Sequence, residues 1–316
     1  MEKTLNGCDN LKKSFFSRLK KDIFTNPLVY CFAIPVIAFY VIFMYIPMWG
    51  SLIAFYEYKP LLGISGSKFV GLEKFVEFIK GPYFSRVVVN TFMLNLWALV
   101  LGFPAPIILA LMINEVKNTI FKKVVQTITY VPHFISLVVI CGLIRIFLHP
   151  TYGVMGFFYT TITGSEMPML AQAALFRPIY TISGIWEAVG WSSIIYLASI
   201  AGVSQELYEA ATIDGANRFQ QMWHITISSI APTIIILFIF QIGGMMASGS
   251  EKIILLYNPA TYETADTIGS YIYRRGLVEA DYSLSTAVGL MGSIVNFALL
   301  WGTNIIARKY SETSLW

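Results

Sequence analysis

The sequence predicts an all-α, polytopic integral membrane protein with six transmembrane helices. Of its 316 residues, 56% are apolar and 13% are charged, whereas soluble domains are about 45–50% apolar and about 25% charged. Six runs contain no Asp, Glu, Lys or Arg: Pro27–Tyr56, Val87–Ile113, Val124–Ile144, Ala188–Gln205, Phe219–Ser250 and Tyr282–Ala307. A helix needs about 20 mostly apolar residues to cross the hydrocarbon core, and its backbone must satisfy its own hydrogen bonds. Disordered, collagen-like and ordinary cytosolic proteins are excluded.

Residues 1–26 are predicted to form a basic amphipathic leader on the cytoplasmic side. Apolar residues recur every four positions between lysines and arginines, at Leu11, Phe15, Leu19 and Ile23. Such a helix lies on the inner membrane surface; a solvated, positively charged flank is the alternative. Basic residues also occur near 117–123 and at 308–309. By the positive-inside rule, these segments and the leader lie in the cytoplasm, which places both termini there. Four lysines fall in the opposite loop: Lys59, Lys68, Lys74 and Lys80.

Residues 27–316 are predicted to form one six-span domain. The spans are expected at about Pro27–Tyr45, Val87–Ile113, Val124–Phe147, Ile179–Ala201, Ile230–Ala247 and Tyr282–Ala307. Pro35 and Pro47 should kink or end the first span. Outside segments rich in glycine and proline should join the spans at Glu57–Phe84, His149–Arg177 and Gly249–Asp281. A cytoplasmic segment should run from Gly202 to about Ser229.

The chain shows no enzyme motif. His133, His149 and His224 lie on different segments, without a second ligand at metal-binding spacing. Neither a phosphate-binding loop nor a dinucleotide-binding glycine pattern occurs. The stretch Gly63–Gly66 matches the Gly-x-Ser-Gly of an intramembrane protease, but no histidine is placed to act as its base, so a plain turn is favoured. We therefore expect no catalytic residue, no metal site and no bound cofactor.

Polar residues within the spans mark a candidate translocation path. Glu187 is the sole acidic residue well inside a span, and Trp186 and Trp191 flank it. Intramembrane charges usually face a cavity or a partner. Aromatic faces with polar neighbours suit sugar rings, but tryptophan also collects at the membrane interface, so both interpretations stay open. The neutral polar residues of the spans favour interhelical hydrogen bonds: Asn90, Asn95, Gln241, Asn296 and Asn304.

The segment Ser204–Arg218 is predicted to form two short helices around Gly215. Leu207, Ala210 and Ala211 share one helix face at spacings of three and four residues. The pair Asp214-Gly215 is a helix-break signal, because glycine readily takes a positive φ. A polar helix pair at the membrane surface is well placed to be gripped by a soluble partner.

This segment resembles the EAA loop of the permease subunits of ATP-binding-cassette importers. The stretch Tyr208–Ala216, followed by Ile225, is similar to the carbohydrate branch, the maltose and glycerol-phosphate permease type. The stretches Ile195–Ala198, Tyr271–Arg274 and Ser314–Trp316 resemble permeases for complex oligosaccharides and polysaccharides. The resemblance covers the chain from about residue 27 to its end. The usual loop proline is replaced by Ser228, so the fifth span should start earlier.

The resemblance implies a type I importer permease fold in a bacterial cytoplasmic membrane. It implies a second EAA permease, two ATPase subunits that hold ATP and Mg, and an external sugar-binding protein, with no nucleic acid. Coupling to the ATPase would fall to Tyr208, Glu209, Ala210, Ala211, Asp214, Gly215 and Ala216. The sugar path would be lined by Trp186, Glu187, Trp191, Gln241, Met245 and Ser248.

Three alternatives remain beside an oligosaccharide importer. The first is an importer for a sugar phosphate or a peptide. The spans carry basic residues only near their outer ends, at Arg86 and Arg145, which disfavours an anionic substrate. A secondary transporter usually shows an internal repeat, and none is visible. An intramembrane enzyme needs a paired acid, base or nucleophile within the bilayer.

Overall fold

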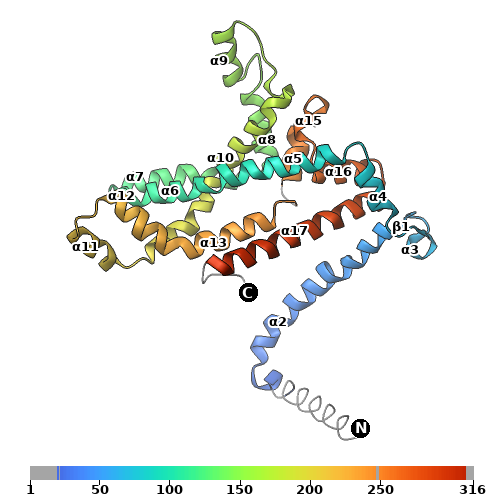
Figure 1. The fold of residues 1–316 in the computed structure, drawn as a ribbon, viewed down its shortest axis with the longest axis horizontal. Helices are drawn as coiled ribbons and strands as arrows, with labels where there is room; N and C mark the ends of the chain where they lie inside the picture. Colours follow the sequence, from blue (N-terminus) through green and yellow to red (C-terminus); the bar gives the residue numbers. More distant parts are fainter. Residues whose placement is uncertain (1–19, 21, 247–248, 311–316) are drawn as a thin grey trace. The chain divides into compact units, whose positions relative to one another are not determined.

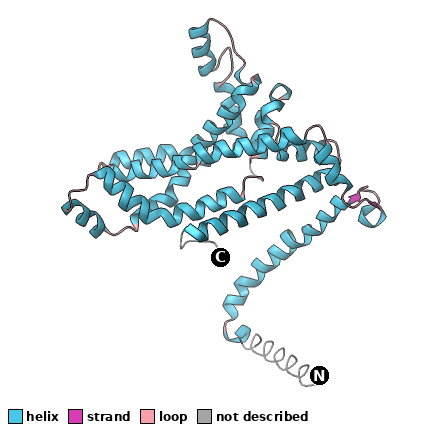
Figure 2. Cartoon of the chain, viewed as in Figure 1, coloured by secondary structure: helices cyan, strands magenta, loops and turns pink. Residues whose placement is uncertain are grey.

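The computed structural model describes residues 20, 22–246 and 249–310. The described residues are mostly helical, and their two strands are the short pair β1 (Tyr56–Glu57) and β2 (Lys68–Phe69) (Figure 2). The chain divides into two units at residue 53, and each is described by itself. The all-α fold class predicted from the sequence is confirmed.

The first unit contains an apolar helix that runs from Pro27 into the second unit at Phe55. It comprises α2 (Pro27–Tyr40), the π-helical turn η1 (Val41–Tyr45) and the 3₁₀ segment η2 (Ile46–Phe55). The predicted end at Tyr45 is wrong, because Pro47 lies at the start of the 3₁₀ segment, where a missing N–H is tolerated. Leu11, Phe15 and Leu19 of the predicted leader lie outside the described residues.

The second unit begins with a small folded segment before the next span. Strands β1 and β2 pair antiparallel, and α3 (Gly63–Gly66) lies between them. Gly63 has φ +66°, which fits the predicted turn. Helix α4 (Glu73–Lys80) follows. The second span then runs from Phe84 to Glu115 as α5 (Phe84–Trp97), η3 (Ala98–Gly102) and α6 (Pro104–Glu115).

The third predicted span, Val124–Phe147, is not one straight helix. Helix α7 (Thr119–Tyr130) and the turn η4 (Val131–Phe134) meet α8 (Leu137–Phe147) at a bend of 104°. Pro132 lies in the turn, and Ser136 caps α8 by accepting a hydrogen bond from the Val139 N–H. Helix α8 leads to α9 (Val154–Thr163) and to η5 (Met169–Ala171), and α8 and α9 project from the main bundle (Figure 1).

The fourth and fifth spans are long helices joined by a short helical loop. Helix α10 covers Ala173–Ala201, and α11 covers Gln205–Ile213. The fifth span runs from Arg218 to Gly243 as α12 (Arg218–Gln221), η6 (Met222–Ile227) and α13 (Ser228–Gly243). It starts before the expected Ile230 because no proline stands at Ser228, so the helix continues through this point.

The last segment before the sixth span consists of short helices. They are α14 (Ser250–Leu256), η7 (Pro259–Thr261), α15 (Tyr262–Ala265), α16 (Ile268–Tyr273) and η8 (Arg274–Val278). The sixth span is α17 (Tyr282–Tyr310). Five helices of the described chain are long and apolar enough to cross a membrane, and the bent α7–α8 pair makes up to six.

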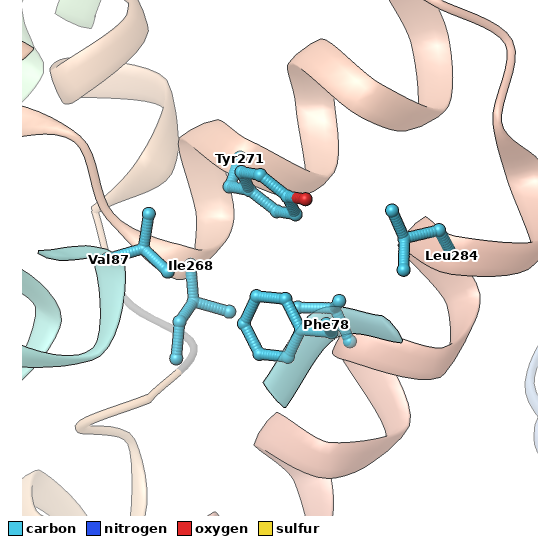
Figure 3. Packing of buried hydrophobic residues seen from close by; sticks show 6 residues of the cluster. Phe78, Val87, Ile268, Tyr271 and Leu284 are labelled. Carbon is cyan, nitrogen blue, oxygen red and sulfur yellow. The ribbon is translucent and has the colours of Figure 1, made fainter. Parts of the chain in front are cut away.

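Buried contacts hold these short helices on the spans. Phe78, Val87, Ile268, Tyr271 and Leu284 form one apolar cluster where α4, α5, α16 and α17 meet (Figure 3). A second cluster packs α6, α10 and α13 together through residues that include Leu111, Tyr196 and Ile230.

A buried charge network adds to this packing. The Asp266 side chain is fully buried and lies 2.8 Å from an Arg86 nitrogen and 2.9 Å from an Arg274 nitrogen. Asn90 donates to the backbone oxygens of Glu263 and Asp266. Burial acts to lower the pKa of Arg274, but hydrogen bonds and the charge of Asp266 raise this pKa above its ordinary value. The network fixes the last segment to the start of the second span.

Candidate functional site

A cavity of about 840 Å³ lies within the second unit, between α5, α10, α13 and α14. This volume falls in the range of small-molecule sites, about 300–1,000 Å³. Polar residues from all four helices line it, together with aromatic side chains. The polar lining includes Asn95, Thr181, Glu187, Gln241, Ser250 and Lys252, and the aromatic lining includes Phe103, Tyr180, Trp191 and Phe240.

An ion pair crosses one wall of the cavity. The Lys252 Nζ of α14 lies 3.1 Å from the Glu187 Oε2 of α10 and 5.5 Å from the centre of the Tyr180 ring. The Lys252 side chain is 8% exposed and that of Glu187 is 27% exposed. A buried ammonium without a partner would be costly, so Glu187 compensates its desolvation.

Glycine at the start of α14 allows this helix to approach α10 closely. A Cβ at Gly184 of α10 would lie 3.7 Å from the Lys252 Nζ, an ordinary van der Waals distance, so that position does not require glycine. Gly249 has φ +81°, and a Cβ on it would lie 1.8 Å from the Tyr180 hydroxyl oxygen. Both the backbone conformation and the contact therefore require glycine at the start of α14.

Thr181 contributes a polar atom without a protein partner. Its side chain is 3% exposed, and its Oγ1 forms no hydrogen bond within the described residues. Buried polar atoms are rarely left unpaired in native proteins. Thr181 lines the cavity, but its Oγ1 is itself buried and is not exposed to a group that enters.

The structure brings together some of the predicted path residues and separates others. Glu187, Trp191 and Gln241 line the cavity, and one face of the Trp191 ring stacks on His133 with centroids 4.6 Å apart. Trp186 does not line the cavity and is 46% exposed. Met245 is buried away from the lining, and Ser248 lies outside the described residues.

Lys252 is a charged lining residue that sequence reasoning missed. The sequence places it in an outside segment, because it follows the fifth apolar run. The helix α14 turns back against α10, which brings Lys252 to a residue 65 positions earlier in the chain. The sequence did contain a signal for this pair: Lys252 lies close to a span end, and Glu187 is a single intramembrane carboxylate that needs a partner.

The predicted coupling segment is an exposed pair of helices. Ser204 caps α11, and Gly215 has φ +79°. The Ala216 N–H donates to the Ala211 oxygen at 2.8 Å and the Gly215 N–H to the Thr212 oxygen at 3.1 Å. These two bonds form a Schellman motif, which ends the helix as predicted.

A capping box orders the start of α12, and the side chains of Gln221 and Tyr208 link α11 to the start of the fifth span. Asn217 and Gln220 form a capping box at the start of α12. The Gln221 Nε2 donates to the Thr212 hydroxyl at 3.1 Å and to the Ala216 oxygen at 3.0 Å. The Tyr208 hydroxyl lies 2.9 Å from the Thr226 hydroxyl.

Helix α11 presents an apolar surface without a partner in the described chain. Ile213 is 87% exposed and Leu207 is 49% exposed, and Glu209 and Ala210 are also exposed. Figure 1 shows α11 at one end of the bundle, with α4 and α16 at the other end. Asp214 is exposed at the helix end, whereas Ala211 and Ala216 are half-buried.

Curated relatives match nearly the whole chain. Protein LplB of Bacillus subtilis (strain 168) is 41% identical over 302 residues, which cover 96% of this chain and 94% of the relative. The polygalacturonan/rhamnogalacturonan transport system permease protein YteP of the same organism is 39% identical over 305 residues, which cover 96% and 95%. The arabinooligosaccharides transport system permease protein AraP of this organism is 27% identical over 84% of each chain.

A solved structure matches the fold. A chain of a bacterial alginate ABC transporter, crystallised in complex with an alginate pentasaccharide-bound periplasmic protein, superposes with a TM-score of 0.87 at 42% identity. The match covers 94% of this chain and all of the other. The family model of the binding-protein-dependent transport system inner membrane component matches residues 102–312. The chain therefore belongs to the family of inner membrane components of binding-protein-dependent transport systems.

Proposed function

We propose that this chain forms half of the translocation path of an ATP-driven importer that carries oligosaccharides into a bacterial cell. One observation carries the proposal: a cavity whose lining includes polar and aromatic groups lies among the spans, while an exposed helix pair lies at one end of the same bundle. The first feature suits passage of a hydrophilic solute, and the second suits docking of a soluble motor. The chain itself has no catalytic role in this arrangement.

Relatives support the substrate class. The names of three similar proteins refer to alginate, to polygalacturonan and rhamnogalacturonan, and to arabinooligosaccharides. A cavity with aromatic and hydroxyl-binding groups fits such ligands, because sugar rings offer C–H faces for stacking and hydroxyls for hydrogen bonds. A sugar phosphate is less well served, since the one cation of the described lining, Lys252, is paired with Glu187.

The division of labour follows from the features of the chain. A second permease completes the path, and an external binding protein delivers the sugar. Two ATPase subunits, which hold ATP and Mg, dock on the exposed α11 and on its counterpart in the second permease. Both termini and α11 lie in the cytoplasm, because an ATPase supplied with cellular ATP works only there.

Reconstitution tests this function. The full complex of two permeases, two ATPases and the loaded binding protein should take up sugar into proteoliposomes when ATP is enclosed with the ATPases. The chain alone, at equal density, should take up none, because it lacks an ATP site and has half of the path. Uptake by the chain alone without ATP would contradict the importer assignment and favour a secondary transporter.

A further inference from the structure

We propose that the Glu187–Lys252 pair sets the charge selectivity of the cavity, which accepts an uncharged sugar segment and excludes an anionic one. The inference rests on the proposed sugar path and specifies its substrate class. The relatives do not agree on this point, since alginate and polygalacturonan are acidic polysaccharides and arabinooligosaccharides are neutral.

The charges of the wall favour a neutral ligand. Lys252 is the sole Lys or Arg among the described lining residues, whereas two carboxylates, Glu187 and Glu251, line the same space. The Lys252 ammonium is almost covered, while its partner Glu187 is more than three times as exposed. An entering solute therefore meets the carboxylate more readily than the ammonium.

The nearby arginines lie outside the cavity wall. Arg86 and Arg274 are held by the buried carboxylate of Asp266, and Arg177 donates to the Asn90 oxygen at 2.9 Å. None of these three side chains lines the cavity. Apart from Lys252, the described lining therefore offers no positive charge that could pair with the carboxylate of an acidic sugar.

Sugar hydroxyls fit the groups that are present. A carboxylate accepts hydrogen bonds from hydroxyls, and charged acceptors bind more strongly than neutral ones. The amide of Gln241 supplies a further polar partner in the same lining. A sugar carboxylate placed at Glu187 would instead meet a like charge at short range, which is strongly unfavourable in a site of low dielectric.

Two matched probes test the proposal: tetragalacturonate and its fully methyl-esterified, uncharged form. Binding to the assembled complex is measured without ATP or binding protein, through the fluorescence of Trp191 in the cavity wall. A Trp191→Phe complex identifies the signal that comes from this site. The wild-type complex should bind the ester at least about tenfold more tightly than the acid.

Variants separate charge from folding. Glu187→Gln should remove most of the preference for the ester, because Lys252 then faces the cavity without its counter-charge. The exchanged pair Glu187→Lys with Lys252→Glu keeps the pair neutral but places the ammonium at the more exposed position, so it should shift the preference toward the acid. Glu166→Gln removes one carboxylate from an exposed loop outside the lining and should leave the preference unchanged.

Three results would overturn the proposal. The first is that the wild type binds the acid as tightly as the ester or more tightly. The second is that Glu187→Gln leaves the ratio of the two dissociation constants unchanged. The third is that neither probe changes the fluorescence of Trp191. These results are independent of ATP-driven uptake. The reconstitution experiment therefore tests the importer function, whereas the ratio of the affinities for the ester and the acid tests the charge selectivity.

Discussion

Gly215 determines how α11 ends, and the consequence is testable at this single residue. Its φ is +79°, and a Cβ there would meet no atom within 4 Å. Gly215→Ala therefore adds only a backbone cost of about 1 kcal/mol. We expect normal membrane insertion and subunit assembly, but roughly fivefold lower sugar uptake and ATPase stimulation, because the angle between α11 and α12 is no longer fixed. Both rates are measured in reconstituted complexes.

Gly164 provides the matched control for this variant. It ends α9 with φ +72° and also has free space around the position of a Cβ. Gly164→Ala therefore carries the same backbone cost in a segment between the third and fourth spans. We expect near-normal uptake. Equal losses in both variants would mean that general destabilisation, rather than coupling, explains the effect at Gly215.

The local conformation of a single residue was predictable where it depends on neighbours within one helical turn. The helix break at Gly215 follows from Asp214-Gly215 alone. The position of Trp186 was not predictable in this way, because it precedes Glu187 by one residue and so points about 100° away around the helix. Lys252 was missed because its partner lies on another helix, and that contact depends on the path of α14.

Close crossing of helices makes Gly190 important at the scale of the element. A Cβ on Gly190 of α10 would lie 2.1 Å from the Thr129 oxygen of α7. Membrane helices approach closely through such small residues. We expect Gly190→Ala to force the two helices apart at a cost of about 1–3 kcal/mol. The melting temperature of the purified protein in detergent should fall by several degrees, at roughly 2–4 °C per kcal/mol.

Gly142→Ala is the comparison for this crossing. Gly142 lies in α8, and a Cβ there would meet no atom within 4 Å. Alanine favours a helix over glycine, so the melting temperature should stay equal or rise. A Gly190→Ala protein as stable as the wild type would show that the two helices do not pack at this point.

Helix positions were predictable from apolar runs, but the third span was not. By length and hydropathy, Val124–Phe147 is one apolar run, whereas Pro132 and the Ser136 cap divide it into two helices. Proline in a span is often tolerated, because neighbouring groups satisfy the freed backbone. The sequence therefore does not indicate which proline bends a helix slightly and which redirects it.

The topology of the whole molecule depends on whether this bent pair crosses the membrane. If it does, the segments around Leu61 and Ala260 lie outside and the segment around Ile213 lies in the cytoplasm. If the pair returns to the side it entered from, Leu61 and Ile213 share a side and Ala260 lies opposite. All three residues are exposed, so single cysteines at these positions, in a chain whose own cysteines are replaced, distinguish the two arrangements.

We expect a membrane-impermeant thiol reagent to label Leu61→Cys and Ala260→Cys in intact cells, and to label Ile213→Cys only after the membrane is opened. The physical reason is the proposed coupling surface: α11 exposes Leu207 and Ile213 without a partner in the described chain, and an ATPase could cover them only in the cytoplasm. Labelling of Ile213→Cys from outside, with Ala260→Cys protected, would make the α7–α8 pair re-entrant. That result would place α11 beyond the reach of any cytoplasmic ATPase and refute its role in coupling.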